Sequence, residues 1–220
     1  MASSDWLDVN ALAAAIVHGS EGEPRILVGI DGPGGSGKST LAAALAECLD
    51  EARVVHVDDF YLPSKEHGTR AGQVGALFDL PRLADQVVIP AAAGSARYQR
   101  YDWDTDTLAD WIEIPDRVPV IVEGVYSLHQ PLRAAYTYTV FCHADHGTRL
   151  ARGVARDGEE ARATWADEWM PAEDAYLHHE DPAGFAQLVI DSSTASDNNQ
   201  PLYRIIHWKD PVQRLPSIHA

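Results

Sequence analysis

Short apolar runs alternate along the chain with longer segments of helical composition. The apolar runs are residues 25–31, 53–58, 118–124, 136–144 and 186–191. Each is rich in β-branched or aromatic residues, which is typical of a buried strand. Helical patterns cover about 6–18, 38–50, 80–94 and 146–180. Strands that alternate with helices predict a three-layer α/β/α fold around a mainly parallel five-stranded sheet. An edge strand is expected over 203–208.

Two parts of the chain depart from this regular alternation. After the second strand comes a long irregular segment, and residues 97–103 and 107–115 then predict a small strand pair. The length fits one α/β domain. The pattern therefore predicts a single domain over 1–220, in which about 60–115 is an insertion and about 146–180 is a helical region.

The composition is that of a globular protein with a strongly acidic surface. Hydrophobic residues make up 45% of the chain, and the formal net charge is −16. Such a charge disfavours phosphate backbones, so no nucleic-acid partner is expected. Cys48 and Cys142 match neither a disulfide framework nor a zinc spacing, which favours the cytoplasm. The first residues lack the basic segment of a signal peptide, and no apolar run approaches the roughly 20 residues of a membrane span.

The stretch "GPGGSGKS", Gly32 to Ser39, matches the phosphate-loop pattern G-x-x-x-x-G-K-[ST] in full. It lies between a predicted strand and a predicted helix, which predicts a P-loop NTPase. Glycines let backbone N–H groups point inward, and the helix N-terminus adds partial positive charge. Lys38 is expected to reach the β- and γ-phosphates of ATP, and the Ser39 hydroxyl to bind Mg²⁺. The expected nucleotide-binding residues are Gly32, Pro33, Gly34, Gly35, Ser36, Gly37, Lys38, Ser39 and Thr40.

The phosphate loop alone does not decide between GTPases, motor ATPases and small kinases. The sequence has no N-K-x-D motif for guanine, and the chain is short for a motor, which favours a small-molecule kinase. Transfer of a phosphoryl group to a hydroxyl needs a carboxylate to orient the hydroxyl or accept its proton. Asp58 ends the second predicted strand, at the sheet edge where α/β proteins bind ligands. It is the candidate base, and a loop-opening Asx turn is the alternative.

Six motifs occur in an order that is similar to a known group of kinases. They are "VGIDGPGGSGKSTLA", "HVDDFYLP", "FDLPRL", "YQRYDW", "VIVEGVYSL" and "TRLARGVARDG". This order resembles the uridine kinase and phosphoribulokinase group of P-loop kinases, over about residues 25–191. The resemblance implies ATP, Mg²⁺ and a small-molecule hydroxyl acceptor. It also implies that the 60–115 insertion binds the acceptor and that 146–180 forms a helical lid.

The resemblance further implies roles for single residues. Asp58 corresponds to the catalytic base of the group. Glu123 corresponds to a carboxylate near Mg²⁺, together with Ser39 and Asp58, and a strand-end carboxylate can hold this metal through water. The residues implied near the acceptor are Asp58, Tyr61, Phe78, Asp79, Tyr101 and Asp102.

Three arginines, Arg149, Arg152 and Arg156, share one face of the predicted helical region, because they are spaced by three and four. The resemblance places lid arginines here, over the nucleotide and the transferring phosphate. Arg152 is expected on the nucleotide, and Arg156 is expected to act in catalysis with Lys38 and Asp58. For Arg149 a lid role and a surface ion pair remain equal alternatives.

Departures from the group leave the acceptor open. Asp59 stands where a small residue is more usual and resembles the D-D-F of nicotinamide riboside kinases. Trp103 replaces the usual Phe, and "DTDTLADW" replaces a basic, histidine-containing stretch. A nucleoside is the favoured acceptor. Nicotinamide riboside, pantothenate, a sugar, and a nucleotide-binding regulatory ATPase without kinase activity are the alternatives. The sequence also leaves a homo-oligomer open.

Overall fold

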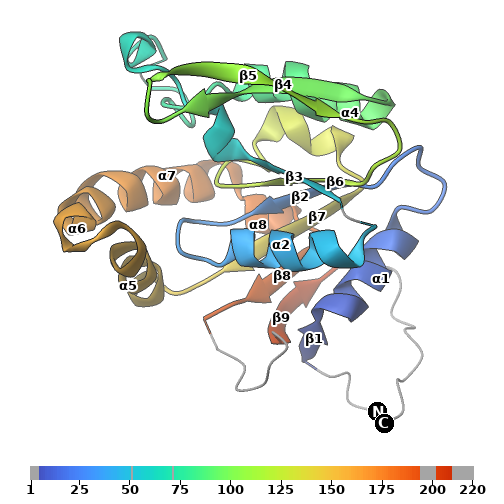
Figure 1. The fold of residues 1–220 in the computed structure, drawn as a ribbon. Helices are drawn as coiled ribbons and strands as arrows, with labels where there is room; N and C mark the ends of the chain where they lie inside the picture. Colours follow the sequence, from blue (N-terminus) through green and yellow to red (C-terminus); the bar gives the residue numbers. More distant parts are fainter. Residues whose placement is uncertain (1–4, 51, 71, 194–201, 210–220) are drawn as a thin grey trace.

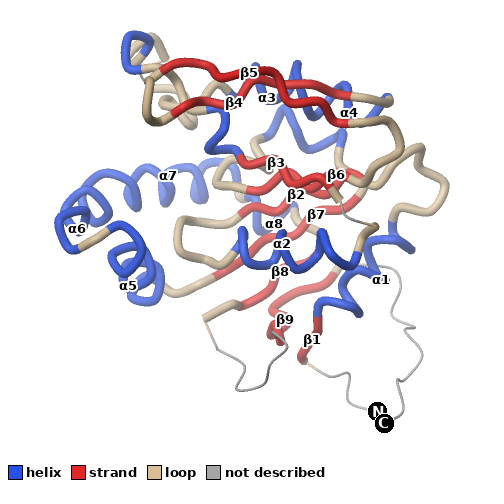
Figure 2. The backbone as a smooth tube through the Cα atoms, viewed as in Figure 1, coloured by secondary structure: helices blue, strands red, loops and turns tan. Residues whose placement is uncertain are grey.

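A seven-stranded sheet forms the centre of the protein (Figures 1 and 2). The structure is a computed structural model that describes residues 5–50, 52–70, 72–193 and 202–209. Five neighbouring strands are parallel to one another. In sheet order they are β3 (Arg53–His56), β6 (Val120–Glu123), β2 (Leu27–Asp31), β7 (Tyr138–His143) and β8 (Leu188–Asp191). The mainly parallel α/β sheet predicted from the sequence is confirmed.

Two antiparallel strands extend the sheet beyond the predicted five. β9 (Leu202–Trp208) pairs with β8, and β1 (Trp6–Asp8) pairs with β9 at the edge. The strand expected over 203–208 is therefore present, but it lies inside the sheet. The expectation of a helix from residue 6 is wrong at its start, because α1 spans Val9–Gly19 and Asp8 caps its first turn. Local pattern could not show that Trp6–Asp8 pairs with a strand from the other end of the chain.

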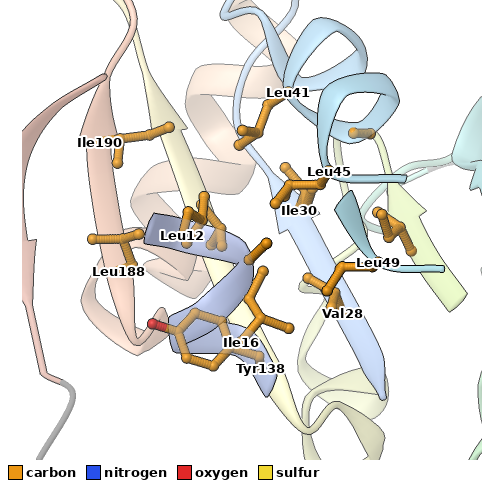
Figure 3. Close-up of a cluster of buried hydrophobic side chains, with 14 of the residues drawn as sticks. Leu12, Ile16, Val28, Ile30, Leu41, Leu45, Leu49, Tyr138, Leu188 and Ile190 are labelled. Atoms are coloured by element: carbon orange, nitrogen blue, oxygen red, sulfur yellow. The ribbon is translucent and has the colours of Figure 1, made fainter. Parts of the chain in front are cut away.

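Side chains alternate between the two faces of the parallel strands, and helices cover both faces. On one face, α1 and α2 (Lys38–Cys48) pack over Val28 and Ile30 of β2, as Figure 3 shows. On the other face, the helices of the insertion and of the segment before β8 pack over Val120 and Val122 of β6. The result is the expected three-layer arrangement, with the ends of the parallel strands left for a site.

The insertion between β3 and β6 forms a small layer of its own beside the sheet (Figure 1). It carries the expected helical run and strand pair. Its regular elements are two 3-10 turns (Val57–Phe60 and Ser64–Glu66), α3 (Leu80–Leu83), a π-helical turn (Ala84–Val88), α4 (Ile89–Ala93) and the hairpin of β4 (Ala96–Asp102) and β5 (Thr107–Ile114).

Arg25 fastens this layer to the main sheet. Its buried guanidinium donates hydrogen bonds to the backbone carbonyls of Ala91, Gly94, Pro115 and Val118. Two of these carbonyls lie at the end of the helical run of the insertion and two lie after its hairpin, so one side chain joins both places to the start of β2. Five N–H donors make arginine suited to this role.

Residues 146–180 are helical, as predicted. The segment contains α5 (His146–Asp157), α6 (Arg162–Thr164), a π-helical turn (Trp165–Trp169) and α7 (Met170–Glu180), and α8 (Pro182–Phe185) follows. Pro171 does not break the segment, because the chain keeps helical backbone angles at Trp169 and Met170, and the proline directly follows the π-helical turn, where the regular hydrogen-bond pattern already changes. In Figure 1 the segment extends to one side of the sheet, near the loop before α2.

Candidate active site

The phosphate loop connects β2 to α2, as the sequence predicted. Gly35 and Gly37 have φ angles of +74° and +82°, and Gly37 caps α2 in this left-handed conformation, which favours glycine. The first N–H groups of α2 have no partner within the helix and can therefore meet an anion. Lys38 is buried, and its Nζ donates to the carbonyl of Pro33 at 3.0 Å, so its charge lies over the loop.

Asp31 supports the loop from beneath and was not among the predicted residues. Its carboxylate accepts hydrogen bonds from the N–H groups of Gly32 (2.6 Å) and Leu128 (2.7 Å) and from the Tyr176 hydroxyl (2.6 Å). The side chain is fully buried, and this burial raises the pKa of Asp31 to about 6, although the three hydrogen bonds and the charge of Lys38 oppose the change. Its place directly before the loop was the only sequence signal.

Glu123 lies beside the start of α2, at the end of the neighbouring strand β6. The Ser39 hydroxyl donates to Glu123 Oε1 at 2.9 Å, and His56 Nδ1 lies 2.5 Å from the same oxygen. Burial acts to raise the pKa of Glu123, but the hydrogen bond from His56 and the charge of Lys38 more than offset it, so the pKa is lowered. The structure thus brings together two of the predicted metal residues, Ser39 and Glu123, and adds His56.

Asp58 follows β3 in the 3-10 turn, two residues beyond the end of the strand. Its side chain is accessible to solvent but is crowded by protein on most sides. This desolvation, together with the negative charge of Glu123, raises the pKa of Asp58, while Lys38 and Arg156 act to lower it. Asp58 therefore lies within electrostatic reach of the loop lysine, of the metal-side carboxylate and of one predicted lid arginine.

Asp59 points the other way, into the insertion. The Tyr98 hydroxyl donates to Asp59 Oδ2 at 3.0 Å, and Arg82 donates to the Asp59 carbonyl at 3.3 Å. Burial raises the pKa of Asp59, and the bond from Tyr98 opposes this change. The two neighbouring carboxylates thus differ in surroundings, because one faces the loop and the other fastens the 3-10 turn to β4.

A row of aromatic rings extends from the hairpin to α7. The Tyr61 ring lies 4.7 Å from Trp103, 5.5 Å from Tyr101 and 5.4 Å from Phe78, measured between centroids. Phe78 in turn contacts Tyr126 at 5.4 Å. The predicted acceptor residues Tyr61, Phe78 and Tyr101 are therefore brought together, and 62% of Trp103 is exposed above them.

Tyr126 continues this row towards the helical segment. Its ring lies 4.8 Å from that of Tyr176 in α7, and its φ is +74°, which is rare for a bulky residue. Backbone strain of this kind persists only where the surroundings hold it in place. No local pattern indicated this contact, which links the aromatic row to the helix whose Tyr176 also supports Asp31.

The two remaining predicted acceptor residues, Asp79 and Asp102, form local contacts. Asp79 caps α3 by accepting from the Arg82 N–H at 3.2 Å, and it forms ion pairs with Arg70 at 2.7 Å and Arg82 at 3.5 Å. Asp102 accepts from the Asp104 N–H at 2.9 Å within the hairpin turn. Asp79 lies next to Phe78, at the border of the aromatic row, whereas Asp102 lies towards the outside of the hairpin.

The three arginines of α5 have three different environments. Arg149 is buried and pairs with Glu173 at 2.8 Å and Asp174 at 3.0 Å, so it forms a buried ion pair and not the surface pair that was one of its two alternatives. Arg152 donates to the Gly35 carbonyl at 3.1 Å, which places it on the phosphate loop. Arg156 is largely exposed, pairs with Asp157 at 2.7 Å and is close enough to Asp58 to affect its pKa.

Comparison with known proteins assigns the chain to a family. No family model matches it. The uridine kinase of Alkaliphilus metalliredigens is 30% identical over 148 residues, which cover 63% of this chain and 71% of that protein. The chain belongs to the uridine kinase group of P-loop kinases.

Two solved structures have a similar fold. A possible uridine kinase from Bacillus stearothermophilus has a TM-score of 0.63 at 24% identity and covers 82% of this chain and 96% of that one. A putative fructose transport system kinase from Silicibacter has a TM-score of 0.57 at 24% identity, over 77% of this chain and 95% of that one. At this identity the likeness shows the fold, a P-loop kinase fold.

The residues of this uridine kinase-group protein fit a nucleotide with Mg²⁺. The loop and the first turn of α2 offer N–H groups and Lys38, and Ser39 and Glu123 offer two oxygens side by side. Within the described ranges, no three His, Cys, Asp or Glu side chains form a metal-binding group. Mg²⁺ usually binds through one or two protein groups together with substrate phosphates, which is a role that Ser39 and Glu123 would fit. Among the described helices, none has the length and apolar character to span a bilayer.

Proposed function

We propose that this protein transfers the γ-phosphate of ATP to a hydroxyl of a nucleoside. Membership of the uridine kinase group supports a small-molecule kinase. The observation that carries the finer proposal is the position of Asp58, between the charged loop residues and the aromatic row that begins at Tyr61. A base at this position can serve a hydroxyl whose ring system rests on the aromatic side chains.

In the proposed reaction, the loop and Lys38 hold the phosphates, and Ser39 and Glu123 hold Mg²⁺. When bound, Mg²⁺ would neutralise charge on the phosphates. Asp58 orients the acceptor hydroxyl and takes its proton as the oxygen–phosphorus bond forms and the bond from the γ-phosphorus to the ADP oxygen breaks. A raised pKa makes Asp58 a better proton acceptor. Arg152 and Arg156 would supply positive charge from α5, which acts as a lid.

The aromatic row supports a planar acceptor over an aliphatic one. Stacking on aromatic side chains is worth about 1–3 kcal/mol per nucleic-acid base and tolerates different bases. Tyr61 offers a ring to stack on, and Trp103 now covers it from the exposed hairpin turn. Asp79, at the border of the row, would meet the sugar hydroxyls. Tyr101 and the more peripheral Asp102 would complete the acceptor side.

An assay of ADP release against a panel of acceptors tests the proposal. The panel holds nucleosides, nicotinamide riboside, pantothenate and sugars, with mass spectrometry of the product. We expect stimulation by a nucleoside and a product heavier by one phosphate. Release of ADP that no acceptor stimulates would instead support a regulatory ATPase.

Two neighbouring variants separate the base from its surroundings. Asp58→Asn is expected to lower kcat by about 10²- to 10⁴-fold, because the proton acceptor is lost, while MgATP binding measured by calorimetry stays within a few fold. Asp59→Asn is the matched control, because Asp59 is the adjacent carboxylate but is tied to Tyr98. Near-full turnover in Asp58→Asn with the identified acceptor would show that Asp58 is not the base.

A further inference from the structure

Glu173, in α7, connects the helical segment directly to the phosphate loop. Its Oε2 accepts a hydrogen bond from the Gly34 N–H at 3.0 Å and another from Arg149 Nη2 at 2.8 Å. One carboxylate oxygen therefore bridges the loop, α7 and α5. No sequence motif pointed to this residue.

The surroundings make this contact tight. Trp165 is buried against Gly34, so that a Cβ on Gly34 would lie only 2.7 Å from the indole. The Arg149 backbone packs equally closely against Gly35, where an added Cβ would meet its carbonyl oxygen at 2.6 Å. Glu173 is only 8% exposed, and its position is fixed from both sides.

A buried carboxylate is also unusual next to a loop that suits phosphate groups. Burial raises the pKa of Glu173, and the positive charge of Lys38 is the largest influence that opposes the change, followed by the Gly34 N–H and Arg149. Lys38 is the residue expected to neutralise the nucleotide phosphates. Its ammonium donates to the Pro33 carbonyl, and its positive charge also acts on Glu173, next to a loop whose N–H groups suit an anion.

We propose that Glu173 is an internal anion that sets the affinity of the phosphate loop, because it competes with the nucleotide phosphates for Lys38 and for the loop. This inference rests on the proposed function only in that the loop binds ATP. Like charges held a few ångströms apart, in surroundings poorer in water than the bulk, repel each other strongly. Glu173 therefore weakens nucleotide binding, and more so for ATP than for the less charged ADP.

Glu173→Gln tests this role, because glutamine keeps the shape and can still accept the Gly34 N–H but carries no charge. We expect the Kd for MgATP to fall roughly tenfold, and the Kd for MgADP to fall less. Both are measured by calorimetry on the full chain. If Glu173 only props up the loop, Gln should leave MgATP binding unchanged or weaken it, and either result would overturn the proposal.

Two matched variants on the same helix serve as controls. Glu180→Gln removes another buried carboxylate of α7, which is held by His129 and the Gln130 N–H and lies away from the loop. Asp174→Asn removes the second partner of Arg149 without a contact to the loop. Neither control should tighten MgATP binding. Equal tightening in all three variants would show that the change in net charge alone is responsible, and this result would overturn the specific role of Glu173.

A second measurement needs no variant. In the wild-type protein, amide hydrogen exchange across residues 165–180 should increase when MgATP is added without acceptor, because the phosphates displace Glu173 from Gly34. Unchanged or slower exchange there contradicts the proposal. Failure of the proposed function would give a different result, since the wild-type protein would then bind MgATP but phosphorylate no acceptor. The MgATP affinities of the wild type and Glu173→Gln could still be compared.

Discussion

The buried carboxylate of Asp31 should leave a signature in the pH dependence of stability. Burial raises its pKa from 3.8 to about 6 in the folded protein. A raised folded-state pKa means that its stabilising effect is full below pH 3.8 and is lost as the pH rises through about 6. The whole loss amounts to about 3 kcal/mol at 1.36 kcal/mol per pKa unit, of which about 1.4 kcal/mol falls between pH 5 and 7.5.

Asp31→Asn removes this titration with little change in volume. It leaves one of the donors from Gly32, Leu128 and Tyr176 poorly satisfied, at about 1–3 kcal/mol, but that effect does not depend on pH. The free energy of unfolding, from urea titrations at several pH values, gives the difference between wild type and variant. Relative to the variant, the wild type should lose about 1.4 kcal/mol from pH 5 to 7.5.

Asp191→Asn is a control of opposite sign. Burial acts to raise the pKa of Asp191, but the hydrogen bond from Arg204 and those from Ser193 outweigh it, so the pKa is lowered. The stability that Asp191 contributes is present above its unfolded pKa and is lost as the pH falls. A flat difference curve for Asp31→Asn between pH 5 and 7.5, or one of reversed slope, would refute the raised pKa of the buried Asp31 carboxyl.

Two further substitutions test the packing around the site. Gly34→Ala should displace the helical segment, since the new methyl group would lie 2.7 Å from Trp165 and 2.9 Å from Glu173. Faster proteolysis within residues 160–180 would detect this displacement. Gly147→Ala is the control, because a Cβ there meets its neighbours at an ordinary contact distance. Arg25→Met should lower the free energy of unfolding by about 3 kcal/mol, because buried carbonyls lose their donors; an unchanged urea midpoint would argue against the fastening role.

The sequence predicted those parts of the site that depend on single elements and their order. The phosphate loop has a strict pattern between a strand and a helix, and its place followed directly. Ser39 and Glu123 could be expected near each other because parallel strands end at one edge of a sheet, and the 2.9 Å hydrogen bond between them confirms it. The alternating pattern also predicted the hairpin that carries Tyr101, and the pairing of β4 with β5 confirms it.

The contacts that depend on how distant helices dock could not be read from the chain. Glu173 looks like one acid among several on a helix, and only the fold brings it to Gly34. Arg149 and Arg156 have the same spacing pattern and similar neighbours, yet one is buried in an ion pair and the other is exposed. The aromatic row likewise joins residues from the insertion to α7 through Tyr126, whose backbone conformation no local rule would suggest.

The hydrogen bond from Tyr176 to Asp31 joins residues 145 positions apart. A ribosome therefore releases the complete "GPGGSGKS" signature long before the residue that finishes its support. Until α7 has docked, the growing chain contains the motif, but the loop lacks the support of Tyr176. The loop is then only partly folded and binds nucleotide weakly. ATP should consequently protect the completed chain against degradation far better than it protects fragments that stop short of Tyr176.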